Sequence, residues 1–257
     1  MRHIQGPAGG LAVEEHGQGP GRTIVLVHGM GGEAPFWHGV VRSLAHAHRV
    51  LIPELRGHGR SDVPADHDYS IEACADDLEA ICDALDLRGI VLVGHSFGAS
   101  IAIELAGRGH DRVAGLVILD GAGDFSGVPE QALHDFLAGL DHDEWYAPTL
   151  DQAIDVALEG ASNDTERRVR AAMLAAPPPM VRAMYRSLLS YHPLPALDRY
   201  AGPLLLVTAP MNASDFALHA LRPSFPRHAM DGVSHWLQMD APTETARLIT
   251  EFTAGLP

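Results

Sequence analysis

Residues 90–108 read IVLVGHSFGASIAIELAGR, a continuous apolar run followed directly by a stretch rich in small residues. The apolar run, residues 90–93, has the composition of a strand buried on both faces, and the stretch after it has that of a helix. Gly94 and Gly98 lie two positions before and two positions after Ser96, where a tight strand-to-helix turn leaves no room for side chains. The pattern therefore predicts a sharp turn that holds the Ser96 hydroxyl above the end of a sheet.

Short apolar runs alternate with helical patterns on both sides of this turn. The predicted strands cover residues 11–16, 23–27, 49–53, 90–93, 113–119, 203–207 and 227–230. The predicted helices cover residues 36–47, 70–85, 96–108, 214–221 and 242–252, and Ser70 is the expected N-cap of the second. This alternation predicts an α/β fold with a mainly parallel sheet flanked by helices.

The alternation stops between residues 121 and 200. This segment contains helical patches and three consecutive prolines, residues 177–179, but no pattern typical of a buried strand. We therefore expect a core domain built from residues 1–120 and 201–257, with residues 121–200 inserted as a helical cap.

The composition restricts the partners of the chain. Its 257 residues carry a net charge of −15, and so acidic a surface repels nucleic acid and anionic membranes. No signal-like segment opens the chain and no apolar run reaches membrane-spanning length, which predicts a cytoplasmic protein. The 16 histidines show no spacing typical of a metal site, so we expect neither a metal nor a cofactor.

The chain resembles the α/β-hydrolase superfamily over nearly its whole length. Besides the Ser96 turn, three further segments carry this resemblance. Residues 28–32 (HGMGG) resemble its oxyanion loop, and residues 55–62 (LRGHGRSD) resemble its turn after the next strand. Residues 232–235 (GVSH) resemble its histidine loop. The resemblance implies a serine hydrolase with a helical cap, in which Ser96 is the nucleophile and His235, last in chain order, is the general base.

A serine that attacks a carbonyl group creates an oxyanion, which fixed hydrogen-bond donors must stabilise. The backbone N–H of Phe97, directly after the nucleophile, is one expected donor. The resemblance implies that the backbone N–H of Met30 is the other. Each such donor typically lowers the barrier by about 3–4 kcal/mol.

The acid that orients His235 has more than one candidate. The position that most of the superfamily uses falls on Asn212, whose amide cannot stabilise an imidazolium as a carboxylate does. We favour Asp120, at the end of the strand 113–119, because haloalkane dehalogenases and zearalenone lactonases carry the acid at this strand end. Asp215 and Asp124 remain the alternatives. A serine nucleophile argues against halide displacement, which needs a carboxylate in that place.

Aromatic and methionine residues in the cap predict a mostly apolar pocket. Phe36, Trp37, Phe97 and Trp236 flank the motifs, and Trp145 lies in the cap; we expect these side chains to form its wall. The predicted substrate is a small to medium, mostly apolar carboxylic ester or lactone. Carbon–carbon bond hydrolysis, cofactor-free perhydrolysis and a non-catalytic small-ligand receptor are alternative functions on the same scaffold.

Overall fold

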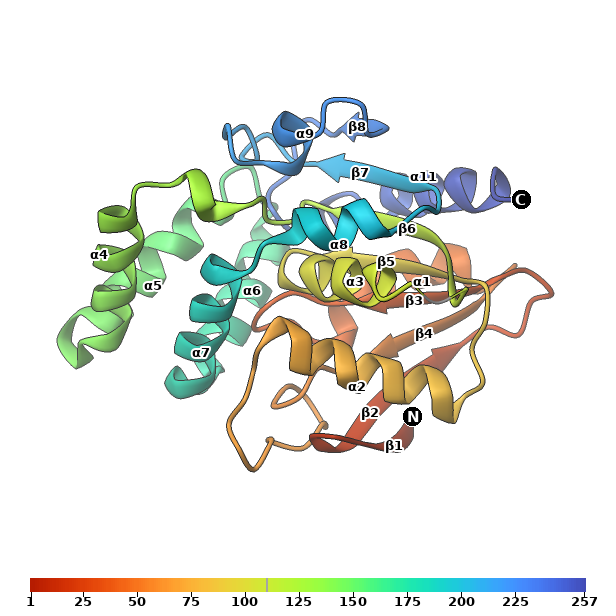
Figure 1. Ribbon diagram of the computed structural model, residues 1–257, viewed down its shortest axis with the longest axis horizontal. Helices are drawn as coiled ribbons and strands as arrows, with labels where there is room; N and C mark the ends of the chain where they lie inside the picture. The colour runs from red at the N-terminus through yellow and green to blue at the C-terminus, as the bar shows by residue number, and fades with distance from the viewer. Residues whose placement is uncertain (110) are drawn as a thin grey trace.

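One mainly parallel sheet forms the centre of the computed structural model, which describes residues 1–109 and 111–257 (Figure 1). Its strands are β1 (Arg2–Gly6), β2 (Gly9–His16), β3 (Thr23–Val27), β4 (Arg49–Pro53), β5 (Ile90–His95), β6 (Val113–Leu119), β7 (Leu204–Thr208) and β8 (Arg227–Ala229). They are ordered β1-β2-β4-β3-β5-β6-β7-β8. The pairs β1/β2 and β2/β4 are antiparallel, and every later pair is parallel. The predicted fold class is confirmed.

Helices cover both faces of this sheet. The α-helices are α1 (His38–Leu44), α2 (Ile71–Ala84), α3 (Phe97–Gly107), α4 (Glu130–Asp141), α5 (Asp143–Ala157), α6 (Asn163–Ala175), α7 (Pro178–Ser190), α8 (Pro193–Arg199), α9 (Leu218–Leu221), α10 (Leu237–Asp240) and α11 (Pro242–Ala254); η1 (Ala34–Trp37) and η2 (Phe125–Gly127) are 3₁₀ helices. Helices α2, α3 and α8 pack together on one face, and α1 and α11 pack on the other (Figure 1). Among the described residues, none of these helices combines the length and apolar character needed to span a membrane.

Successive side chains of the central strands enter different cores. In β3, Ile24 and Leu26 belong to the core beneath α1 and α11, whereas Val25 and Val27 belong to the core beneath α2 and α3. All four are fully buried, because strand side chains alternate between faces and both faces of this sheet are covered. The continuous apolar runs in the sequence follow from this double burial.

Local signals in the sequence explain most element boundaries. The Ser70 hydroxyl accepts a hydrogen bond from the Ala73 N–H at 3.2 Å and caps α2, as predicted. The helix expected over 214–221 is only the short α9. Strand β1 was not predicted, because its sequence is mostly polar and only Ile4 is buried in this edge strand.

The segment between β6 and β7 contains helices and no strand, and all of it is described. Helices α4 to α7 lie beyond the carboxyl ends of the parallel strands, to the left in Figure 1. Helix α8 packs against α3, on the face of the sheet, although it falls inside the segment 121–200 that the sequence assigns to the cap. The segment between β6 and β7 therefore places four helices beyond the end of the sheet where Ser96 lies.

Candidate active site

Ser96 occupies a strained turn between β5 and α3. Its φ and ψ are 54° and −120°, in a region that residues other than glycine rarely adopt. A Cβ atom at position 94 would lie 2.3 Å from the Gly98 carbonyl oxygen, and one at position 98 would lie 2.4 Å from that of His28. Both positions therefore require glycine, which explains the spacing seen in the sequence.

Asp120 directly follows β6 and has a positive φ as well, 43°. One carboxylate oxygen of this buried residue lies 2.6 Å from Nδ1 of His235, and the other accepts the Ala209 N–H at 2.8 Å. Burial raises the pKa of the Asp120 carboxyl, but the hydrogen bonds from His235 and Ala209 outweigh it and hold the pKa below its usual range. Asp120 is thus an ionised carboxylate at neutral pH.

The His235 loop is fixed by its backbone and by its neighbours. The His235 N–H donates to the Ala157 carbonyl oxygen at the end of α5 at 3.0 Å. The His235 carbonyl oxygen accepts Nε2–H of His95 at 2.8 Å. One position earlier, the Ser234 hydroxyl donates to Asp240 at 2.5 Å. These contacts join the loop both to β5 and to α5.

The other candidate acids lie elsewhere. Asp215 is exposed, and Asp124 accepts the Ser126 N–H at 3.0 Å and pairs with Nδ1 of His192 at 3.1 Å. Asn212 donates from its side-chain amide to the Gly121 carbonyl oxygen at 3.1 Å. Of these candidates, the structure places only Asp120 against the His235 ring.

The backbone N–H groups of Phe97 and Met30 make no hydrogen bond within the described residues. Phe97 is the first residue of α3, so its N–H lies outside the helical hydrogen-bond ladder. Met30 lies in the loop after β3 and lines the same cavity as Ser96. Within residues 1–109 and 111–257, neither N–H meets an acceptor.

Two buried histidines hold the loop that carries Met30, a role that no sequence pattern indicates. Nε2 of His58 accepts the Gly31 N–H at 3.1 Å, and Nε2 of His28 accepts the Leu55 N–H at 3.0 Å. Nδ1 of His58 faces the Arg56 carbonyl oxygen at 3.0 Å, and Nδ1 of His28 faces that of the next residue at 2.8 Å. Each ring must therefore carry its single proton on Nδ1 and remain neutral.

Burial keeps these rings uncharged. It lowers the pKa of His28 to about 3 and that of His58 to about 4. Burial, followed by the effect of the neighbouring His235 ring, also lowers the pKa of His95 to about 3. These three rings are therefore neutral hydrogen-bonding groups throughout the physiological pH range.

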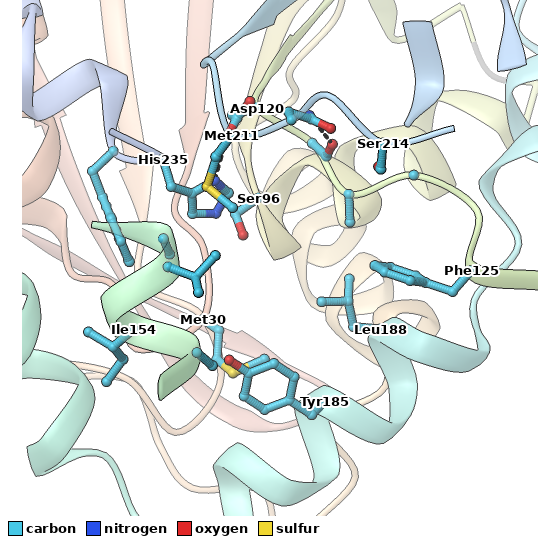
Figure 2. Close-up of a pocket in the computed structure, with 18 of the residues that line it drawn as sticks. Met30, Ser96, Asp120, Phe125, Ile154, Tyr185, Leu188, Met211, Ser214 and His235 are labelled. Carbon is cyan, nitrogen blue, oxygen red and sulfur yellow. Dashed lines mark hydrogen bonds and ion pairs between the residues drawn. The ribbon is translucent and has the colours of Figure 1, made fainter. Parts of the chain in front are cut away.

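Ser96, Asp120 and His235 meet at one cavity of about 410 Å³. Figure 2 shows Ser96 and His235 on one side of it and Tyr185 and Leu188 of α7 on the other. Most of the wall is apolar. It includes Met30, Phe125, Ala153, Ile154, Ala157, Met173, Leu188, Met211, Phe216 and Trp236.

The expected wall residues divide between this cavity and other places. Trp236 lines the cavity, whereas Trp37 is fully buried in the core beneath α1 and α11. Phe36 is buried beside the Arg168 guanidinium, and Trp145 is 58% exposed. The Phe97 side chain packs into the core on the α3 side. These four positions correct our expectation, because proximity to a motif does not determine which way a side chain points.

The chain is similar to known proteins in sequence and in fold. The chain is 36% identical to a 2-hydroxymuconate semialdehyde hydrolase of Pseudomonas sp. over 119 residues, which are 45% of this chain and 42% of that protein. The match therefore spans less than half of the relative's length. A thermophilic esterase from Thermogutta terrifontis superimposes with a TM-score of 0.81 at 24% identity, over 98% of this chain and 97% of that one.

An enol-lactonase from Burkholderia xenovorans superimposes with a TM-score of 0.80 at 17% identity, covering 98% of this chain and all of that one. Identities this low show a shared fold only. At the level of sequence, residues 22–242 match the family described as alpha/beta hydrolase fold. Because this match covers most of the chain, the protein belongs to the alpha/beta hydrolase fold family.

Proposed function

We propose that this protein is a serine hydrolase that cleaves a small to medium, mostly apolar carboxylic ester or lactone through an acyl-enzyme. The observation that carries the proposal is the 2.6 Å hydrogen bond between Asp120 and His235 at the cavity that Ser96 lines. An ionised carboxylate on Nδ1 leaves Nε2 of the same ring to accept a proton from a hydroxyl.

In the proposed mechanism, the Ser96 oxygen attacks the substrate carbonyl carbon while Nε2 of His235 takes the hydroxyl proton. Asp120 stabilises the imidazolium that results. The N–H groups of Met30 and Phe97 donate to the oxyanion, and His235 returns the proton to the departing alkoxide. Water, activated by the same histidine, then breaks the acyl–serine bond and releases the acid.

The cavity suggests the class of substrate. Its wall is apolar on the side formed by α5, α6 and α7, which we propose as the cap assigned to residues 121–200. No lining residue among those described is an arginine, and His235 is the one ionisable base. The pocket therefore favours a neutral acyl or lactone group over an anionic one.

Hydrolysis of a carbon–carbon bond in a diketone is a second candidate. It is favoured by the similarity to the 2-hydroxymuconate semialdehyde hydrolase and to a 2-hydroxy-6-oxo-2,4-heptadienoate hydrolase of Pseudomonas putida. A dienoate carries a carboxylate, however, and none of the described residues that line the cavity carries a fixed positive charge to pair with it. We therefore rank this reaction second.

The test is turnover of p-nitrophenyl acetate and butyrate, a set of neutral lactones and a carboxylate-bearing diketone by the wild type and Ser96→Ala. We expect turnover of esters or lactones by the wild type and a loss of at least about 10⁴-fold in the variant. The unfolding temperature of the variant shows whether it is folded. Equal activity in the two proteins would exclude the serine mechanism, and turnover of the diketone alone would favour the second candidate.

A further inference from the structure

A second group of convergent side chains lies outside the candidate active site, between β2 and the start of α1. Glu14 and His16 are two positions apart on β2 and so point to the same face of the sheet. His38 is the first residue of α1, which packs over that face. One ligand atom from each of the three lies within 4.8 Å of the others.

Two distances within this group are close to those between the ligands of a metal centre. Oε2 of Glu14 lies 3.1 Å from Nε2 of His16 and 2.9 Å from Nε2 of His38. Two ligands of a tetrahedral zinc ion, each about 2.0–2.1 Å from the metal, are separated by about 3.3 Å. The two distances from Glu14 are a few tenths of an ångström shorter than this separation, and one ring nitrogen of each histidine lies within 4.8 Å of the other. A small adjustment of the three side chains would therefore let one ion contact all of them.

The surroundings fix the carboxylate and leave the rings accessible. The Glu14 side chain is only 14% exposed, and its other oxygen accepts a hydrogen bond from Arg60 at 3.0 Å. Burial raises the pKa of Glu14, but the hydrogen bonds from His38 and His16 outweigh it and lower the pKa overall. The two rings are 34% and 43% exposed, which gives an ion a path from solvent and a water molecule room as a fourth ligand.

We propose that Glu14, His16 and His38 bind one Zn²⁺ ion, with water completing a tetrahedral site. Two imidazoles and one carboxylate are a donor set that suits zinc rather than magnesium or calcium, which prefer oxygen ligands. Each ring would bind through Nε2 as the neutral form with its proton on Nδ1, and a ring that starts as an imidazolium would release one proton. No oxidation or reduction is involved.

Such an ion would join β2 to α1 and stabilise the folded state by mass action. The Arg60 charge opposes it, but the Arg60 guanidinium also lies 3.6 Å from the buried Glu54 carboxylate. The net charge of −15 attracts cations to the protein as a whole. This inference is independent of the proposed hydrolase activity.

The experiment is isothermal titration of the full chain with ZnCl₂, with Mg²⁺ as a comparison ion. We expect one saturable zinc site and no magnesium binding. Loss of a residue that hydrogen-bonds to a metal ligand typically weakens metal binding by about 10- to 100-fold. His38→Ala removes a ligand itself and should weaken zinc binding by more than that. His46→Ala removes an exposed histidine just after α1 and is the matched control, which should bind as the wild type does.

A second readout is the unfolding temperature, which zinc should raise in the wild type and His46→Ala but not in His38→Ala. If His38→Ala does not fold, His16→Gln takes its place, and Co²⁺ binding to the wild type should give the visible spectrum of a four-coordinate ion. The proposal is wrong if the wild type binds no zinc. It is also wrong if His38→Ala and His16→Gln bind zinc as tightly as the wild type, or if His235→Ala abolishes the site.

Discussion

The two sides of the cavity are built in different ways. On the side that carries Ser96, here called the core side, Asp120 and the His235 loop are each held by hydrogen bonds to separate parts of the chain, one of them from the end of α5. On the side formed by α5, α6 and α7, here called the cap side, the wall consists of apolar side chains such as Ile154, Met173 and Leu188, which are held by packing alone. The energy of a hydrogen bond falls steeply when its distance or angle changes, whereas the energy of an apolar contact is non-directional and varies gradually with the apolar area that is buried.

This difference leads to a general expectation for variants. A change on the core side should lower kcat for every substrate, because it disturbs geometry that all substrates share. A change on the cap side should alter kcat/KM according to the size of the acyl group, because it alters only the shape of the pocket. The following predictions test this contrast, from the largest expected effect to the smallest.

Asp120→Asn should lower kcat by about 10⁴-fold, since an amide favours the wrong tautomer of His235 and does not stabilise its imidazolium. Steady-state kinetics with p-nitrophenyl butyrate measure the change. Asp215→Asn is the control, because Asp215 is exposed and should leave kcat unchanged. A loss in Asp215→Asn with normal activity in Asp120→Asn would reverse the assignment of the acid.

Mild acid should destabilise the protein through the core side. The pKa values of His28, His58 and His95 lie at about 3, 4 and 3 in the folded protein, against about 6.5 when unfolded. Below pH 6.5 the unfolded chain therefore binds protons that the folded chain excludes, so the free energy of unfolding falls as the pH falls. At about pH 5.5 each of these histidines lowers the free energy of unfolding by about 1.4 kcal/mol relative to neutral pH, and the three together lower it by about 4 kcal/mol.

Urea unfolding at about pH 7.5 and pH 5.5 measures this change. His58→Gln, which cannot titrate, should lose about 1.4 kcal/mol less than the wild type between the two values. An unfolding free energy that stays constant over this interval would contradict the assignment of neutral buried rings.

His58→Ala should lower kcat by about 100-fold with little change in KM. The Gly31 N–H loses its acceptor, and displacement of the neighbouring Met30 N–H by about 1 Å is enough for a loss of that size. Ester kinetics at saturating substrate measure kcat, with the exposed His134→Ala as the control. A rise in KM at constant kcat would show that the loop binds substrate instead of stabilising charge.

Leu188→Ala should lower kcat/KM for p-nitrophenyl hexanoate by about tenfold and leave that for the acetate nearly unchanged. Leu188 lines the cavity, so its loss removes contacts that only a longer acyl chain makes. Leu174→Ala changes a leucine of α6 that is 54% exposed, and it should leave both values unchanged. Equal losses for the two esters would place Leu188 among the residues that position the reacting groups.

The core of the fold could be predicted from the sequence because its signals are local. The runs TIVLV and VAGLVIL are continuous and apolar since the sheet is covered on both faces, and the glycines around Ser96 follow from a backbone clash. Strand β1 carries no such signal, because only Ile4 of its five residues is buried. Edge strands with polar sequences remain hidden from pattern analysis.

The site could be predicted only in part. Asn212 at the usual acid position directed attention to Asp120, and the structure shows Asp120 against His235. The direction of aromatic side chains depends on how helices pack, so Trp145 and Trp37 were assigned to a wall that they do not form. The support that His58 gives to the Met30 loop joins segments that are distant in sequence, and no local pattern records it.

The most direct test of the central claim is to trap the acyl group. The wild type is mixed with p-nitrophenyl butyrate, quenched with acid after a short interval, digested and examined by mass spectrometry. We predict one butyryl group, on the peptide that contains Ser96, and none on that peptide in Ser96→Ala. A butyryl group on a different residue of an active enzyme, or full turnover by Ser96→Ala, would contradict the account.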